Sequence, residues 1–191
     1  MEKNKKNYLS ARGGSASGGK IFLVLVLCLV ARLIPFRAPN VEPILAATMP
    51  LGKLFGAFAG FSFAVLSILL YDIVTGTLGI QTFFTAGAYG MLGLWSASYF
   101  AQNKADAWSF VRFAIVGTLF FDAVTGLIIG PIFFHQSFFQ TLVGQIPFTM
   151  LHLVSNIIFA FVLSPAIYNF LIKKKEKEKL THINILNHKI I

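Results

Sequence analysis

The chain is dominated by long apolar segments that contain almost no charged residues. Six such runs follow one another with short breaks between them: 20–36, 41–52, 54–76, 79–101, 108–134 and 138–172. About 20 helical residues cross the ~30 Å hydrocarbon layer of a bilayer, so four of the runs are long enough to span it. The sequence therefore predicts an all-α polytopic membrane bundle of six transmembrane helices, of which the second is short.

Composition supports a membrane protein, because only 12% of the residues are charged and 56% are hydrophobic. A soluble chain carries about a quarter charged residues. The net charge of +9 lies mostly in the two tails, where anionic lipid explains it better than nucleic acid, since the chain lacks a basic surface interleaved with aromatic residues. We expect a disordered basic tail at 1–19, a transmembrane domain at 20–172 and a second basic tail at 173–191.

The distribution of charge predicts the orientation. If the short second run crosses the bilayer, both basic tails lie in the cytoplasm, as the positive-inside rule requires. Three further basic residues then share that side: Lys53, Lys104 and Arg112. Glu42, Asp72, Asp122 and His135 lie on the outer side. We therefore expect a multi-pass protein of the cell membrane with cytoplasmic N- and C-termini.

One sequence pattern occurs twice, at 63–76 (FAVLSILLYDIVTG) and at 113–126 (FAIVGTLFFDAVTG). Each copy places one carboxylate, Asp72 or Asp122, four residues before a glycine that can end its helix. A carboxylate near lipid is costly and requires a partner. Two alternatives are open for the pair: a clasp with Arg32 and Arg37, or binding of a ligand.

The threonines that follow the two carboxylates, Thr75 and Thr125, are further candidates for ligand binding. Threonine also commonly donates a hydrogen bond back to its own helix. For each threonine taken singly, we favour this local hydrogen bond over ligand binding.

A polar stripe in the last apolar run supplies a second group of candidates. Its members recur at spacings of four, three and four residues, which places them on one helical face: Gln145, Thr149, His152 and Asn156. Lipid offers no hydrogen-bond partners, so this face must point into the bundle. Pro147 beside it favours the wall of a binding site over hydrogen bonds that merely join helices.

The connection after the first run adds Asn40 and Glu42, which we expect at the outer surface facing the two carboxylates. An ordinary turn is the alternative. Aromatic residues between 83 and 95 are candidates for stacking on a flat ligand, or for lipid contact: Phe83, Phe84, Tyr89 and Trp95.

Small residues at four-residue spacing, Gly56, Gly60 and Ala64, predict close helix packing. A docking face for another membrane protein is the alternative. The chain shows no nucleophile motif, phosphate-binding loop or metal-ligand spacing. We therefore expect neither an enzyme nor a bound metal or cofactor.

Three segments together resemble the substrate-binding S components of energy-coupling-factor transporters: PNVEPILAATMPLGKLFGAFAG, YDIVTG and IPFTMLHLVSN. The resemblance covers about residues 20–172. It implies a protein that captures a vitamin or similar micronutrient from outside and joins a transmembrane coupling subunit and two ATPase subunits. It places the substrate site in the outer half, where Asn40, Glu42, Asp72, Asp122, His152 and Asn156 match.

One feature departs from the family, because many members carry an Ala-x-x-x-Ala docking stripe in the first helix and this chain does not. The resemblance then implies docking through Gly56, Gly60 and Ala64. Two other classes of function are open: a structural scaffold, which needs no pocket, and an ion-coupled secondary transporter, for which His152 is the available ionisable residue.

Overall fold

The computed structural model describes residues 18–38 and 40–172, and all regular structure within them is helical. Six helices follow in order: α2 (Gly18–Leu33), α3 (Ile44–Phe55), α4 (Ala57–Thr75), α5 (Ile80–Gln102), α6 (Ala107–Phe134) and α7 (Phe138–Leu171). The expected helical bundle is thus present, with one helix for each apolar run. Gly18 and Gly19 begin α2 rather than belonging to a tail, and the rest of both predicted tails lies outside the described residues.

Capping residues explain several helix ends. Asp106 precedes α6 and its carboxylate accepts a hydrogen bond from the Ser109 amide at 2.8 Å, while Ser137 caps α7 in the same way. Gly76 has a left-handed backbone with φ of 70° and ends α4 after the first repeat. Gly126 does not end its helix, because α6 continues to Phe134.

This difference changes the distance of each repeated carboxylate from the end of its helix. Asp72 lies three residues before the end of α4, whereas Asp122 lies twelve residues before the end of α6. At 1.5 Å per residue, twelve residues correspond to roughly 18 Å of helix. The prediction that the carboxylate lies near its helix end therefore holds for Asp72 but is wrong for Asp122, because α6 and α7 continue to pack together beyond Gly126.

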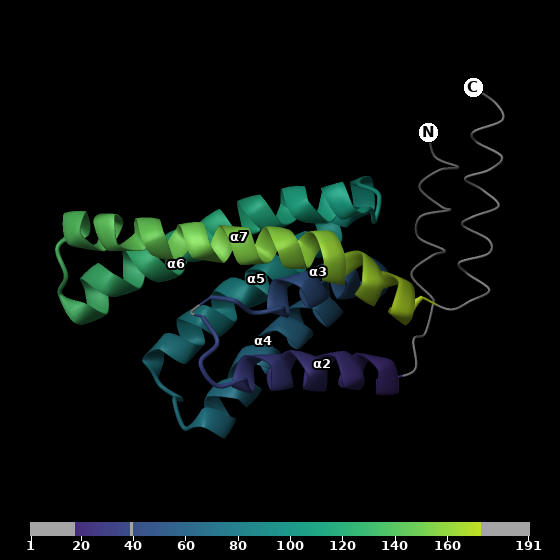
Figure 1. Ribbon diagram of the computed structural model, residues 1–191, viewed down its shortest axis with the longest axis horizontal. Helices are drawn as coiled ribbons and strands as arrows, with labels where there is room; N and C mark the ends of the chain where they lie inside the picture. Colours follow the sequence, from purple (N-terminus) through teal and green to yellow (C-terminus); the bar gives the residue numbers. More distant parts are fainter. Residues whose placement is uncertain (1–17, 39, 173–191) are drawn as a thin grey trace.

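Helix α3 lies in the centre of the bundle (Figure 1). Nearly all of its side chains are buried, and Ile44, Ala47, Met49 and Leu51 are 0% exposed. The antiparallel pairs α4–α5 and α6–α7 enclose it, and α2 packs against the outside through Val24 and Cys28. Twelve residues suffice for α3 because protein rather than lipid surrounds it.

Glycines of α4 and α5 bring the backbones of these two helices into close contact. A Cβ added at Gly93 would lie 2.5 Å from the Gly60 carbonyl oxygen and 2.6 Å from the Phe61 amide nitrogen. Gly60 and Ala64 are both buried by the protein's own helices. They therefore form an internal contact and not a docking face, while Gly56 is the joint between α3 and α4 and has a φ of 91°.

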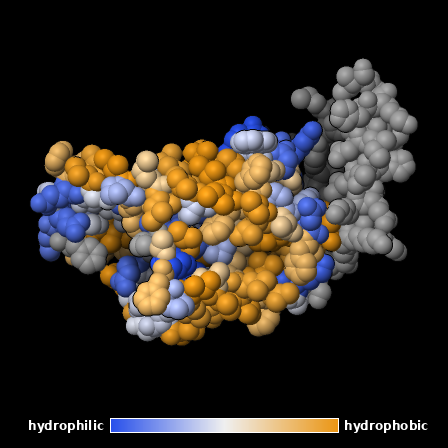
Figure 2. Space-filling view, in the orientation of Figure 1, coloured by the Kyte–Doolittle hydropathy of each residue, from blue (hydrophilic) through white to orange (hydrophobic). Residues whose placement is uncertain are grey.

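Among the described residues, three helices are long and apolar enough to cross a membrane: Ala57–Thr75, Ala107–Phe133 and Phe138–Leu171. Many of their large apolar side chains are exposed, and Figure 2 shows hydrophobic surface over the middle of the molecule with hydrophilic patches towards its ends. Exposed apolar area of this extent is typical of contact with lipid. The structure thus suggests a membrane protein.

Consecutive helices run in opposite directions, so Lys20 and Lys53 lie at one end of the bundle, whereas Arg32 and Arg37 lie at the other. The Lys20 ammonium donates to the Phe170 carbonyl at 2.6 Å, joining the start of α2 to the end of α7. The Lys53 ammonium donates to the carbonyls of Phe100 and Asn103, joining the ends of α3 and α5. The opposite end holds the 34–43 connection and the turns α4–α5 and α6–α7, and we call it the distal end.

Candidate functional site

The candidate site lies along the contact between α6 and α7. Asp122 and His152 meet across it, with 2.7 Å between carboxylate Oδ1 and imidazole Nδ1, and each side chain is 2% exposed. One helical turn away, the Asn156 amide donates to the Thr118 hydroxyl at 2.8 Å. The spacing of four residues on both helices produces these two polar bridges, because antiparallel helices keep such positions in register.

The two bridges leave three buried polar atoms without a hydrogen-bond partner in the described structure. These atoms are Asp122 Oδ2, His152 Nε2 and Asn156 Oδ1. A buried polar group without a partner costs about 1–3 kcal/mol, and a charged one costs more. We call these two bridges and their three unpartnered atoms the α6–α7 polar layer.

Aromatic rings border this layer. The rings of Phe121 and His152 make an edge contact with 5.5 Å between their centroids. Phe148, which lies on α7 with His152, makes a similar edge contact with it at 6.2 Å. Phe121 also packs on Tyr89, at 4.4 Å between ring centroids. The layer is therefore held in apolar surroundings, where electrostatic interactions are strong.

Tyr89 connects the layer to a second buried cluster. Its hydroxyl donates to Glu42 Oε1 at 2.6 Å, and Arg32 Nε lies 2.9 Å from Glu42 Oε2. The Arg32 guanidinium stacks on the Tyr71 ring at 3.8 Å. Arg32 Nη1 has no hydrogen-bond partner in the described part of the chain.

The connection between α2 and α3 folds over this region. Asn40 adopts a left-handed backbone with φ of 63°, and its carbonyl accepts a hydrogen bond from the Ser155 hydroxyl at 2.7 Å. Its amide donates weakly to the Phe148 carbonyl at 3.5 Å. Arg37 donates to the Val41 carbonyl at 2.6 Å. Asn40 therefore contacts α7 next to the α6–α7 polar layer, whereas Glu42 is connected to that layer only through Tyr89.

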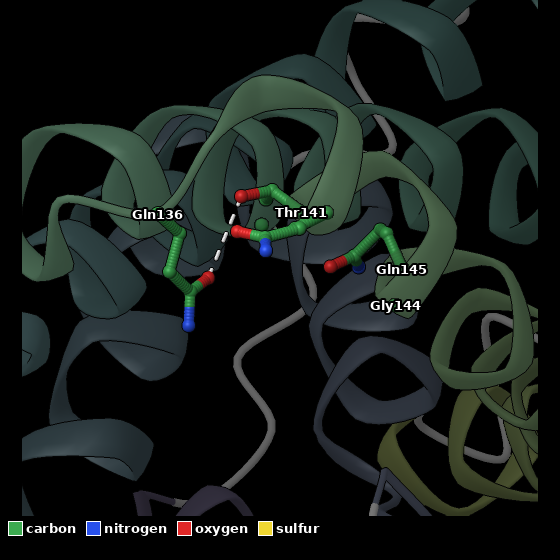
Figure 3. A pocket seen from close by; sticks show the side chains of 6 residues that line it. Gln136, Thr141, Gly144 and Gln145 are labelled. Carbon is green, nitrogen blue, oxygen red and sulfur yellow. Dashed lines mark hydrogen bonds between the residues drawn. The ribbon is translucent and has the colours of Figure 1, made fainter.

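An open hollow of about 370 Å³ lies farther along the same helix pair (Figure 3). It is lined by glycines and uncharged polar residues: Gly126, Gln136, Gln140, Thr141, Gly144 and Gln145. Two of these lining residues are joined directly, because the Thr141 hydroxyl donates a hydrogen bond to Gln136 Oε1 at 3.4 Å. Gln145 packs directly against Gly126 and donates to Thr149 at 3.3 Å, so these two predicted residues lie between the hollow and His152.

Asp72 has a different environment from Asp122. Its Oδ2 accepts a hydrogen bond from the Thr82 hydroxyl at 2.6 Å, and its Oδ1 accepts one from Thr77 at 3.4 Å. These bonds close the turn between α4 and α5. Asp72 therefore has a structural role in this turn, and the ion pairs in the described residues do not form the predicted clasp, because Arg32 pairs with Glu42.

Thr75 and Thr125 both donate to the carbonyl four residues earlier, at 2.8 Å. The local hydrogen bond expected for single threonines is thus present in both repeats.

The candidate aromatic residues are not gathered around one cavity. Phe83 is 65% exposed, Phe84 packs on Phe133, and Trp95 packs on Phe113. Only Tyr89 lies beside the site. Stacking of a flat ligand on all four is therefore not supported.

Sequence reasoning missed the partners that complete the site. The sequence predicts a role for the Tyr89 ring alone, whereas the Tyr89 hydroxyl donates to Glu42, and Thr118 is not among the predicted site residues. Thr118 precedes Asp122 by four residues, as His152 precedes Asn156, and this matched spacing was a usable signal. Nothing comparable in the sequence indicated Ser155 as the partner of Asn40.

The described residues contain no group of three or more His, Cys, Asp or Glu side chains that could hold a metal ion. A scan of protein-family models and searches of curated proteins and of solved structures found no match to this chain.

Proposed function

We propose that this protein is a membrane-embedded binding protein that captures a small-molecule substrate, such as a vitamin or similar micronutrient, for uptake. The single observation that carries the proposal is the set of unpartnered polar atoms on Asp122, His152 and Asn156, each residue only 2% exposed. Apolar helices do not retain such groups without a use, because each one destabilises the fold. A bound substrate would supply the missing partners.

The arrangement around the layer supports the same proposal. A helix connection carrying Asn40 covers it, the ion pair of Arg32 and Glu42 fixes one side, and an open hollow lies along the same helix seam. Ligand sites commonly combine apolar walls with a few oriented polar groups.

In this proposal the protein works as an S component of an energy-coupling-factor transporter. It has six transmembrane helices in the cell membrane, with both termini cytoplasmic and the distal end outside. A coupling subunit and two ATPase subunits supply the energy. The resemblance of PNVEPILAATMPLGKLFGAFAG, YDIVTG and IPFTMLHLVSN to that family is the support for these partners. With Gly60 and Ala64 buried, docking must use other surfaces than the predicted one.

Native mass spectrometry of the full chain, purified from cells in mild detergent, tests the proposal. We expect a co-purifying ligand of vitamin-like mass that is retained by Asp72→Asn and lost by Asp122→Asn. Asp72 is the matched control because it occupies the same position in the sequence repeat but closes a turn. A protein that is always empty would contradict substrate binding and favour a structural scaffold.

An ion-coupled secondary transporter is a second candidate, favoured by one observation. Asp122 and His152 form a buried hydrogen-bonded pair, of the kind that carries protons in pumps and transporters. Uptake by cells depleted of ATP but supplied with a proton gradient would favour this candidate. Uptake that requires ATP even when the gradient is intact would favour the energy-coupling-factor mechanism.

A further inference from the structure

The α6–α7 polar layer has a defined hydrogen-bonding character. An ionised carboxylate only accepts hydrogen bonds, so the Asp122 contact requires a proton on His152 Nδ1. In the neutral imidazole, Nε2 then carries a lone pair and accepts. The Asn156 amide uses its NH₂ group for Thr118 and leaves its oxygen as an acceptor. The layer thus contains up to three acceptors that lack donors.

With His152 neutral, the layer carries the negative charge of the Asp122 carboxylate. With a neutral imidazole, Asp122 contributes one uncompensated charge at 2% exposure. Neither nearby arginine forms an ion pair with Asp122: Arg32 pairs with Glu42 at 2.9 Å, and Arg37 donates to the Val41 carbonyl. A buried charge without a counter-charge is strongly unfavourable.

We propose that the group bound in this layer is an organic cation that presents at least two N–H donors, such as a protonated amine or an amidinium. This inference rests on the proposed function and specifies the class of its substrate. The cation neutralises Asp122, and its N–H groups donate to Asp122 Oδ2 and Asn156 Oδ1.

The hollow offers the approach to this layer. Gly126 lies one turn beyond Asp122 on α6, and Gln145 and Thr149 lie two turns and one turn before His152 on α7. The Gln145–Thr149 hydrogen bond, at 3.3 Å, lies along α7 between the hollow and His152. The uncharged amide and hydroxyl lining of the hollow is suited to a polar, uncharged remainder of the same ligand.

The test uses the full chain in detergent and a matched pair of probes, benzamidinium and its neutral analogue benzamide. We expect benzamidinium to raise the melting temperature of the wild type and of Asp72→Asn, and benzamide to have no effect. Asp122→Asn is expected to weaken benzamidinium binding at least tenfold. Asn156→Leu replaces a buried amide by a side chain of similar size and should also weaken benzamidinium binding. This second variant keeps the test informative if Asp122→Asn fails to fold.

Identification of the co-purified ligand separates this inference from the proposed function. A released ligand that is cationic at neutral pH, and is lost with Asp122→Asn, supports both. A neutral or anionic ligand overturns the cation inference and leaves the binding function standing. Equal effects of benzamidinium and benzamide, or undiminished binding in both variants, also overturn it. An empty protein that responds to neither probe overturns the binding function itself.

Discussion

The glycine contact between α4 and α5 provides the most direct test of how this bundle is packed. In Gly93→Ala, the new Cβ would lie 2.5 Å from the Gly60 oxygen and 2.6 Å from the Phe61 nitrogen. Ordinary carbon contacts begin near 3.5 Å. Because the obstructing atoms belong to the backbone, no side chain can rotate away, and the two helices must separate by about 1 Å.

The magnitude follows from the type of contact. Overpacking a well-packed interior costs typically 1–3 kcal/mol, and a backbone obstruction belongs at the upper end. We expect Gly93→Ala to lower the free energy of unfolding by about 3 kcal/mol, which corresponds to a roughly 100-fold change in the unfolding equilibrium. Denaturation in mixed detergent micelles, followed by far-ultraviolet circular dichroism, measures this change.

Gly87 supplies the matched control on the same helix. No atom lies within 4 Å of a Cβ added there, so Gly87→Ala should leave stability unchanged or raise it by up to ~1 kcal/mol through helix propensity. If Gly93→Ala proved as stable as Gly87→Ala, the close approach of α4 and α5 would be wrong, and Gly60 would again be available for docking.

Three other predictions concern the buried ion pair and the orientation. Glu42→Gln, read out by the same denaturation, should destabilise the protein by about 3 kcal/mol because it leaves the Arg32 charge buried without its partner; an unchanged stability would mean that water reaches this guanidinium. Tyr89→Phe removes the hydroxyl that donates to Glu42 and should cost about 1.5 kcal/mol, with a smaller loss expected when Glu42 is already Gln. With the native cysteine replaced, a membrane-impermeant maleimide should label Thr77→Cys but not Lys104→Cys in intact cells, and the opposite pattern would invert the proposed topology.

The sequence by itself determined the helical class and the approximate extent of each helix. Apolar runs must form helices that satisfy their own backbone hydrogen bonds in lipid, and capping residues such as Asp106 and Ser137 begin them. It also determined that His152 and Asn156 point inwards. Helical periodicity places them on one face, and lipid offers no hydrogen-bond partners to that face. These are local properties, which sequence spacing encodes.

Tertiary structure alone decided which of the two like carboxylates belongs to the site. Asp72 and Asp122 occupy the same position in a repeated sequence, but Asp72 meets Thr82 across a turn while Asp122 meets His152 across a helix pair. The physical reason is that a partner is chosen by packing between helices distant in sequence. Packing between distant helices also places Gly60 against Gly93, and it leaves three polar atoms of the α6–α7 polar layer without a hydrogen-bond partner in the described structure.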